Sequence, residues 1–167
     1  GPGPAFYGGN PSDTELDSAD LLQNEGYRVF FTVLEMALED WADVPDPSLP
    51  AGFHTRPVTR QDLPALFESM NGCYTDHPFS DTLQLEPWAA KQADLTTWHV
   101  AWETSSGEVA GQVQALVRDG KPEMEEVSVR APYRRRGLAK ALIAQGLMAL
   151  RTQGAELPRL RTLLENP

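Results

Sequence analysis

The residues best suited to chemistry form a short basic turn, Arg134-Arg135-Arg136-Gly137-Leu138-Ala139-Lys140. A strand-like segment runs into this turn, and an apolar helical pattern follows it at once. The start of a helix presents backbone N–H groups that have no intrahelical partner, and together with the helix dipole these groups attract anions. Basic side chains at that end cost about 0.3–1 kcal/mol each, so stability alone does not account for them. The turn therefore predicts a polyanion site, against the alternative of a solvated basic helix start.

Two small residues of the turn favour phosphate in particular. Gly137 has no Cβ, so the backbone can approach a phosphate closely, and Ala139 is small for the same reason. The whole chain carries a net charge of −10, from 14 basic and 24 acidic residues. Four cations gathered in one turn of an acidic protein indicate a polyphosphate ligand, while the overall charge disfavours nucleic-acid binding.

The elements that must position the turn follow a recognisable order. Strands are expected at 97–103, 109–117 and 124–130, a long helix at 135–153 and a last strand at 160–164. The first three strands form a meander, with turns at 105–107 and 119–120 between them. The strand–helix–strand at the end is expected to be a parallel crossover. The pattern predicts an α/β (α+β mixed-sheet) fold with helices on both faces.

The front of the chain has its own pattern. A short helix is expected over 18–23, followed by a strand over 27–38. Apolar residues occupy both parities of that strand, which predicts a central strand covered on both faces. Three prolines within residues 44–50 predict an extended linker. Thr59, with Asp62 three residues later, is the expected N-cap of a further helix.

A family resemblance is carried by Arg134-x-x-Gly137-x-Ala139. The stretch resembles the Gln/Arg-x-x-Gly-x-Gly/Ala signature of the GCN5-related N-acetyltransferases (GNATs), and the strand before it and the long helix after it match in order. The departure is small, because the family often has proline where this chain has Ala131, beside Pro132. The resemblance implies a GNAT-type acyl-CoA N-acyltransferase fold that binds acetyl-CoA as a co-substrate.

The resemblance also implies roles for individual residues. The strand before the turn splays from its neighbour in the family, so the backbone of Val127 and Val129 is expected to bond the pantetheine amides. The expected cofactor-binding residues are Val127, Val129, Arg134, Arg135, Arg136, Gly137, Leu138, Ala139, Lys140 and Asn166. Glu126 matches the position of the general base in histone-acetylating members, the alternative being a solvent-facing strand residue. Glu125 is expected on the opposite face.

The order of the elements departs from the family. The helix and long strand that should follow the last strand are missing at the end, yet a matching pair stands at the front. Either the chain is a middle segment of a tandem, mycothiol-synthase-like member, or it is permuted. The expected organisation is residues 1–9 as a tag or leader, 10–43 completing the sheet, 44–50 as the linker and 51–167 as the GNAT core. The front piece is expected to close the sheet within its own chain or by exchange into a second copy, giving a homo-oligomer.

Two functions from different classes remain open. The first is direct acetyl transfer from acetyl-CoA to a primary amine of a small molecule or amino-acid-like acceptor. The second is a catalytically degenerate acetyl-CoA-binding or regulatory domain. Leu22 favours the second, because the family's general-acid tyrosine is expected at that position. Glu126 favours the first.

The acceptor site is expected from Tyr74, Asp76 and Trp88, where aromatic and acidic groups suit an amine, although packing is the ordinary role of Trp88. Three scattered histidines and Cys73 offer no metal spacing and no disulfide, so no metal is expected and a cytoplasmic location fits. No apolar run is long enough to span a membrane, so no membrane partner is expected.

Overall fold

The computed structural model describes residues 11–29, 32–73 and 84–163 of the chain. It divides into two compact units, residues 1–34 with 162–167 and residues 35–161. The smaller unit contains the helix α1 (Leu16–Asn24), which includes the short helix expected over residues 18–23. The basic turn and its flanking elements belong to the larger unit.

A six-stranded mixed sheet organises the fold, in the order β1-β6-β5-β4-β3-β2. The strands are β1 (Val33–Ala37), β2 (Phe53–His54), β3 (Trp98–Glu103), β4 (Val109–Arg118), β5 (Lys121–Val129) and β6 (Arg159–Leu163). The strands β2 to β5 pair antiparallel to their neighbours, whereas β5 and β6 are parallel. The predicted meander and the predicted parallel crossover are therefore confirmed.

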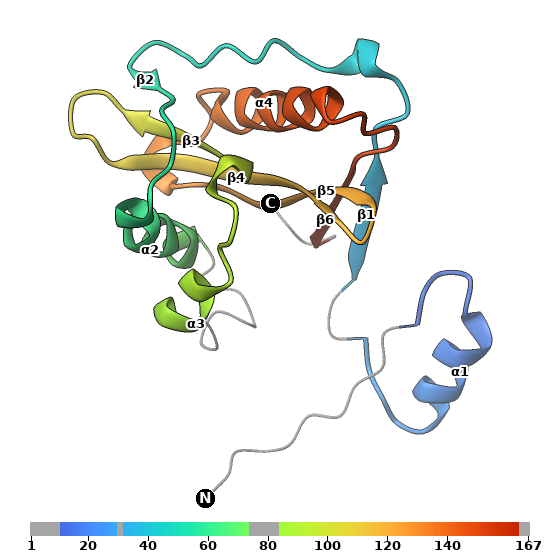
Figure 1. Cartoon of the computed structure of the whole chain (residues 1–167). Coiled ribbons are helices and arrows are strands. Elements are labelled where there is room, and N and C mark those ends of the chain that lie inside the picture. Colours follow the sequence, from blue (N-terminus) through green and yellow to red (C-terminus); the bar gives the residue numbers. More distant parts are fainter. Residues whose placement is uncertain (1–10, 30–31, 74–83, 164–167) are drawn as a thin grey trace, which may run out of the picture. The chain divides into compact units, whose positions relative to one another are not determined.

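Helices cover the two faces of this sheet within the larger unit. The helix α4 (Leu138–Thr152) lies on one face, and α2 (Leu63–Cys73) and α3 (Leu85–Ala90) lie on the other (Figure 1). The long helix begins three residues later than expected, because the turn before it takes a left-handed conformation at Gly137.

Two core clusters correspond to these two faces. The α4 side contains Val113, Met124 and Leu142, and the α2 side contains Leu66 and Val100. The helix α4 approaches the sheet closely at a glycine, since a Cβ on Gly146 would lie 2.7 Å from the Met124 Cε. Each face of the central strands is therefore sealed by a different helix layer.

The strand expected over 27–38 differs from the prediction in position and environment. Within the described residues, β1 begins at Val33, stands at one end of the strand order and is exposed at every position. The helices of the larger unit instead contact β3, β4 and β5. Apolar residues at both parities therefore did not indicate a central, doubly covered strand. The pairing of β1 with β6 occurs within this one chain.

Two local features precede α2, namely its N-cap and the proline-containing segment 44–50. Thr59 and Asp62 form the expected capping box, at a short 3-10 turn (Arg60–Asp62) that runs into α2. Residues 44–50 are free of helix and strand, and they pass beside α4 (Figure 1). Gln145 of α4 donates from Nε2 to the Pro47 carbonyl at 2.8 Å, so this extended segment is fixed to the helix.

Candidate functional site

The basic turn forms an uncapped helix start. A 3-10 turn (Ala131–Tyr133) ends β5, and Arg135 and Gly137 then take positive φ angles of 63° and 87°. Gly137 is the N-cap of α4, and no side chain caps the helix there. The first helical hydrogen bond runs from the Ala141 N–H to the Gly137 carbonyl at 3.1 Å. The N–H groups before Ala141 are therefore available to an anion.

The arginines around the turn divide into two groups. Arg130 donates to Glu108 Oε2 at 2.9 Å, and Arg134 Nε donates to the Val129 carbonyl at 3.0 Å. Arg136 lies with its guanidinium 5.8 Å from the centroid of the Tyr133 ring. These three side chains hold the turn against the end of β5.

The remaining two cations of the turn are Arg135 and Lys140. Arg135 and Lys140 are exposed, and neither has an ion-pair partner among the described residues. Both flank the uncapped helix start. A free positive charge next to free N–H groups is what a bound polyphosphate requires.

The strand β5 loses its parallel neighbour on the way to this turn. The β5–β6 ladder contains only the pairs Glu123–Arg159 and Met124–Leu160 within the described residues. Both strands continue beyond these pairs, β5 to Val129 and β6 to Leu163. From about Glu125 onward, the β6-facing backbone of β5 therefore has no strand partner among the described residues. Val127 lies in this stretch, whereas the carbonyl of Val129 already accepts the Arg134 bond.

Glu126 occupies a β-bulge. The register with β4 shifts between Gln112 and Gln114, which oppose Ser128 and Glu125, so β5 has one residue more than β4 there. Glu126 takes a positive φ of 53°, which is uncommon for a residue other than glycine and favours a local distortion. Glu125 was expected on the sheet face opposite to Glu126 because side chains alternate along a strand. The bulge breaks this alternation.

The electrostatic setting of Glu126 suits a base. Burial raises the pKa of its carboxyl, and the negative charge of Glu125 raises that pKa further. Burial also raises the pKa of Glu125, while the Arg118 guanidinium, 2.9 Å from its Oε2, opposes this shift. A raised carboxyl pKa lies closer to neutral pH, where a general base is most effective.

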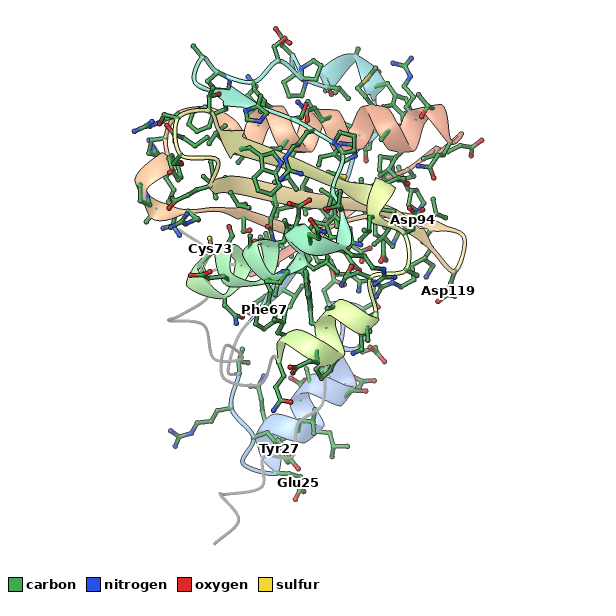
Figure 2. The ribbon with its side chains drawn as sticks, turned by 60° about the vertical axis from the view of Figure 1, so that its left-hand side comes forward. Glu25, Tyr27, Phe67, Cys73, Asp94 and Asp119 are labelled. Atoms are coloured by element: carbon green, nitrogen blue, oxygen red, sulfur yellow. The ribbon has the colours of Figure 1, made fainter. Side chains whose placement is uncertain are left out.

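The residues expected to bind the acceptor are only partly described. Tyr74, Asp76 and Asn166 lie outside the described residues. Trp88 is buried in the α2-side cluster, with its ring centroid 5.4 Å from Phe67 and 5.8 Å from Trp98. Phe67 projects from α2 (Figure 2). Trp88 therefore packs α3 against the sheet, as its ordinary role would have it.

The sequence reasoning missed a set of buried polar side chains on the same face. Gln112 and Ser128 of the sheet and Ser69 of α2 are buried, and within the part of the chain that the structure describes their side-chain polar atoms have no hydrogen-bond partner. A signal was present, because glutamines at 112 and 114 interrupt an otherwise apolar strand at alternate positions. Polar residues on a buried strand face require a reason beyond packing.

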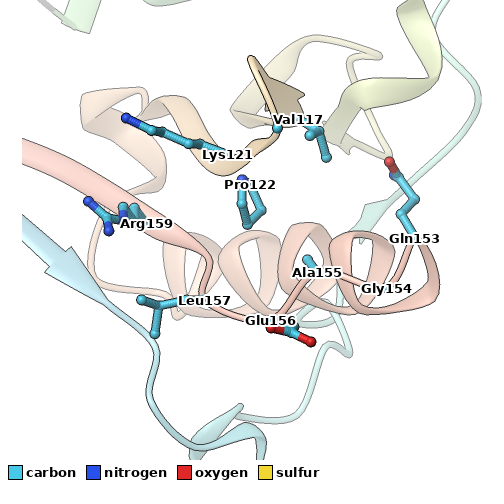
Figure 3. A pocket seen from close by; sticks show the side chains of 10 residues that line it. Val117, Lys121, Pro122, Gln153, Gly154, Ala155, Glu156, Leu157 and Arg159 are labelled. Atoms are coloured by element: carbon cyan, nitrogen blue, oxygen red, sulfur yellow. The ribbon is translucent and has the colours of Figure 1, made fainter.

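A separate cavity of about 440 Å³ lies at the other end of α4. Its walls include Val117 and Pro122 from the β4–β5 hairpin and Leu157 beyond the helix end (Figure 3). None of the residues predicted to bind cofactor or acceptor lines it. Of its charged lining residues, Arg159 is paired with Glu35.

Among the described residues, no group of three or more histidine, cysteine, aspartate or glutamate side chains has a metal-binding arrangement. No helix in those same ranges is long and apolar enough to cross a membrane. Cys73, the last residue of α2, is a free, half-buried thiol.

Comparison with solved structures supports the same fold. A GCN5-related N-acetyltransferase from Sphaerobacter thermophilus is similar at 25% identity and a TM-score of 0.79, over 92% of this chain and 49% of that one. A GNAT family acetyltransferase from Brucella melitensis, in complex with acetyl-CoA, is 27% identical with a TM-score of 0.51, over 62% and 71%. A GCN5-related N-acetyltransferase from Kribbella flavida is 21% identical with a TM-score of 0.55, over 86% and 53%.

The extent of these similarities matters for what they imply. The chain spans about half the length of the Sphaerobacter and Kribbella structures. No curated protein matches it. The model of the acetyltransferase (GNAT) family matches residues 63–167, which include α2, the bulge at Glu126 and the basic turn, and the chain therefore belongs to the GNAT acetyltransferase family.

Proposed function

We propose that this chain transfers an acetyl group from acetyl-CoA directly to the primary amine of a small molecule. The observation that carries the proposal is the uncapped start of α4, flanked by the unpaired cations Arg135 and Lys140. This arrangement stands where β5 has lost its parallel neighbour. The anion site at α4 and the open edge of β5 together suit a long ligand that has phosphate groups at one end and an arm that contains amides.

The residues present fit acetyl-CoA in this respect. The pyrophosphate would take the N–H groups at the start of α4 and the charges of Arg135 and Lys140. The amides of the pantetheine arm would bond the open edge of β5 at Val127. Acetyl-CoA supplies an activated thioester carbonyl, and the Brucella relative was solved with this molecule bound.

The transfer step assigns one task to Glu126. Its carboxylate takes a proton from the incoming ammonium, either directly or through one water molecule. The amine nitrogen attacks the thioester carbonyl carbon, so that a C–N bond forms and the C–S bond breaks. The amide nitrogen releases its second proton, and the coenzyme A thiolate gains one from solvent. The raised pKa of Glu126 supports this role, because a stronger base accepts the proton more readily.

The alternative is a domain that binds acetyl-CoA without turnover. Leu22, which lies in α1, stands where the family resemblance places a tyrosine acid. A thiolate is a fair leaving group, so solvent can supply its proton without that tyrosine. The proposal therefore favours catalysis, and measurement of turnover decides between the two functions.

The experiment compares Gly137→Leu with Gly120→Leu. Both glycines have positive φ angles, 87° and 76°, so both variants carry the same kind of backbone strain, about 1–2 kcal/mol. A Cβ at Gly137 would meet nothing closer than the Pro50 Cγ at 4.0 Å, and a Cβ at Gly120 would meet nothing within 4 Å, so steric overlap with the protein does not confuse the result. Gly120 lies in the β4–β5 turn, beside the Gln153 end of α4 rather than beside its start.

We expect Gly137→Leu to weaken coenzyme A binding at least tenfold by calorimetry, and Gly120→Leu to leave the affinity unchanged. Equal affinities in the two variants would remove the basis for a phosphate site at α4. Release of the coenzyme A thiol with a panel of primary amines then measures turnover. Micromolar binding without thiol release from any amine would favour the binding domain over the enzyme.

A further inference from the structure

A short polar row crosses the α2-side face of the sheet. Val100 of β3 lies opposite Gln112 of β4, and Gln112 lies opposite Ser128 of β5. Directly opposed residues of antiparallel strands point to the same face. Val100 belongs to the cluster that packs under α2, so Gln112 and Ser128 also point to that side.

The polar atoms of this row have no hydrogen-bond partner among residues 11–29, 32–73 and 84–163. Gln112 is fully buried, and within these ranges neither its Nε2 nor its Oε1 is bonded; Ser128 is 6% exposed, and its Oγ has no partner there either. Ser69 of α2, which contacts β4 and β5, is 4% exposed and its Oγ is also unbonded. Folded proteins leave few buried polar groups unsatisfied, because each one costs the full desolvation of that group.

A glutamine two residues away gives the contrast. Gln114 points to the same face, yet its Nε2 donates to Gln92 Oε1 at 3.2 Å and to Thr97 Oγ1 at 3.1 Å. The fold therefore supplies hydrogen-bond acceptors to the carboxamide of Gln114. Gln112 makes no such bonds within the described residues, so its carboxamide can both donate to and accept from a ligand.

The row lies beside the proposed reacting centre. Ser128 follows Glu126 by two residues, in the stretch of β5 that has no β6 partner. Two carboxylates, Glu125 and Glu126, precede Ser128 on this strand, and Arg118 pairs with Glu125. Arg130, two residues after Ser128, is paired with Glu108. These negative charges attract the ammonium group of an acceptor and disfavour an acceptor that also carries a carboxylate.

We propose that Gln112 and Ser128 select an acceptor amine that carries a hydroxyl group near its nitrogen, as amino alcohols and amino sugars do. A carboxamide and a hydroxyl each donate and accept, and so does the hydroxyl of such an acceptor. A carboxylate only accepts, and the nearby glutamates oppose it. This inference rests on the proposed function and narrows its acceptor to hydroxylated amines rather than amino acids.

The test pairs Gln112→Leu with Gln114→Leu in the full chain. Leucine removes a carboxamide of similar length at each position. At Gln114 it breaks two hydrogen bonds, so the melting temperature should fall by about 2–4 °C. At Gln112 it removes only unsatisfied atoms, so the melting temperature should stay the same or rise.

Acceptor preference is measured with 2-aminoethanol, propylamine and glycine. Wild-type protein should acetylate 2-aminoethanol at least tenfold more efficiently, in kcat/KM, than propylamine, and glycine least of all. Gln112→Leu should lower kcat/KM for 2-aminoethanol more than that for propylamine, so that the tenfold ratio between the two amines falls to about one. Ser128→Ala serves as a second variant, with a smaller loss of the same preference.

The outcomes separate this inference from the proposed function. If Gln112→Leu keeps the hydroxyl preference and melts as low as Gln114→Leu, the carboxamide is structural and the inference is wrong. If no amine is acetylated, calorimetric binding of the same amines to coenzyme A-loaded protein still tests the inference. Hydroxyl-selective binding that Gln112→Leu abolishes would support it while contradicting turnover, and equal binding of all three amines would overturn it.

Discussion

At the scale of single residues, Glu126 combines an unusual backbone with a shifted acidity. Its bulge position and its burial place a carboxyl of raised pKa at the open edge of β5. We expect Glu126→Gln to lower kcat by about 10²–10⁴-fold, the usual contribution of a general base. Coenzyme A affinity should not change, because the substitution lies outside the turn proposed to bind the pyrophosphate. Steady-state kinetics and calorimetry check the two parts.

The pH dependence of the same variant provides an independent check. A carboxyl whose folded-state pKa is raised stabilises the fold in its protonated form, below its unfolded pKa, and loses this contribution as the pH rises through the folded pKa. Glu126→Gln should therefore be more stable than wild type at pH 7, and the difference should vanish near pH 4. In activity, the wild-type acid limb should follow the raised pKa of Glu126. An unchanged acid limb in Glu126→Gln would assign the base elsewhere.

At the scale of elements, the start of α2 depends on one aspartate. Asp62 accepts from Arg56 at 2.7 and 2.9 Å and from the backbone and hydroxyl of Thr59, both at 2.8 Å. Its side chain is 13% exposed. The Arg56 hydrogen bonds, with those from Thr59, hold the pKa of the Asp62 carboxyl well below its usual range, against the opposing effect of burial.

Asp62→Asn should cost about 1–3 kcal/mol of unfolding free energy at pH 7, because the charge-assisted bonds and the cap weaken together. A depressed folded-state pKa contributes stability above the unfolded pKa, and that stability is lost as the pH falls. The gap between wild type and variant should therefore narrow below about pH 4 in urea titrations. Asp46→Asn is the control, since Asp46 is exposed and its carboxylate interacts with the side chain and the backbone N–H of the neighbouring Ser48. A gap that persists unchanged at low pH would contradict the assignment.

Much of this element-level structure could be predicted from spacing. Helical periodicity after Gly137, the hairpin signal at Asp119-Gly120 and the Thr59–Asp62 cap each act through neighbours within a few residues. The bulge at Glu126 could not be predicted, because it is defined by register with β4 rather than by local sequence. The lack of described hydrogen-bond partners for the Gln112 side chain likewise depends on which residues pack against it in the folded protein.

At the scale of the whole molecule, the main error of sequence reasoning concerned β1. Its apolar residues at both parities predicted burial, but burial depends on which strands the helices cover, and that is decided by the assembled sheet. Glu35 of β1 pairs with Arg159 and Arg161 of β6, so the strand is joined to its neighbour by charge as well as by backbone. Among the described strands, β1 stands at one edge of the sheet.

An exposed apolar edge strand favours pairing with another chain. Met36 of β1 is 46% exposed, and we expect wild-type protein to associate reversibly as its concentration rises. Met36→Lys should suppress this association, because a charged side chain on an edge opposes strand addition. Met148→Lys on α4, at a methionine that is 40% exposed, adds the same charge away from any strand and should have no effect. Light scattering over a hundredfold concentration range distinguishes the results: a constant monomer mass for wild type would contradict edge pairing, and a dimer that persists in Met36→Lys would indicate exchange of the front segment between two copies instead.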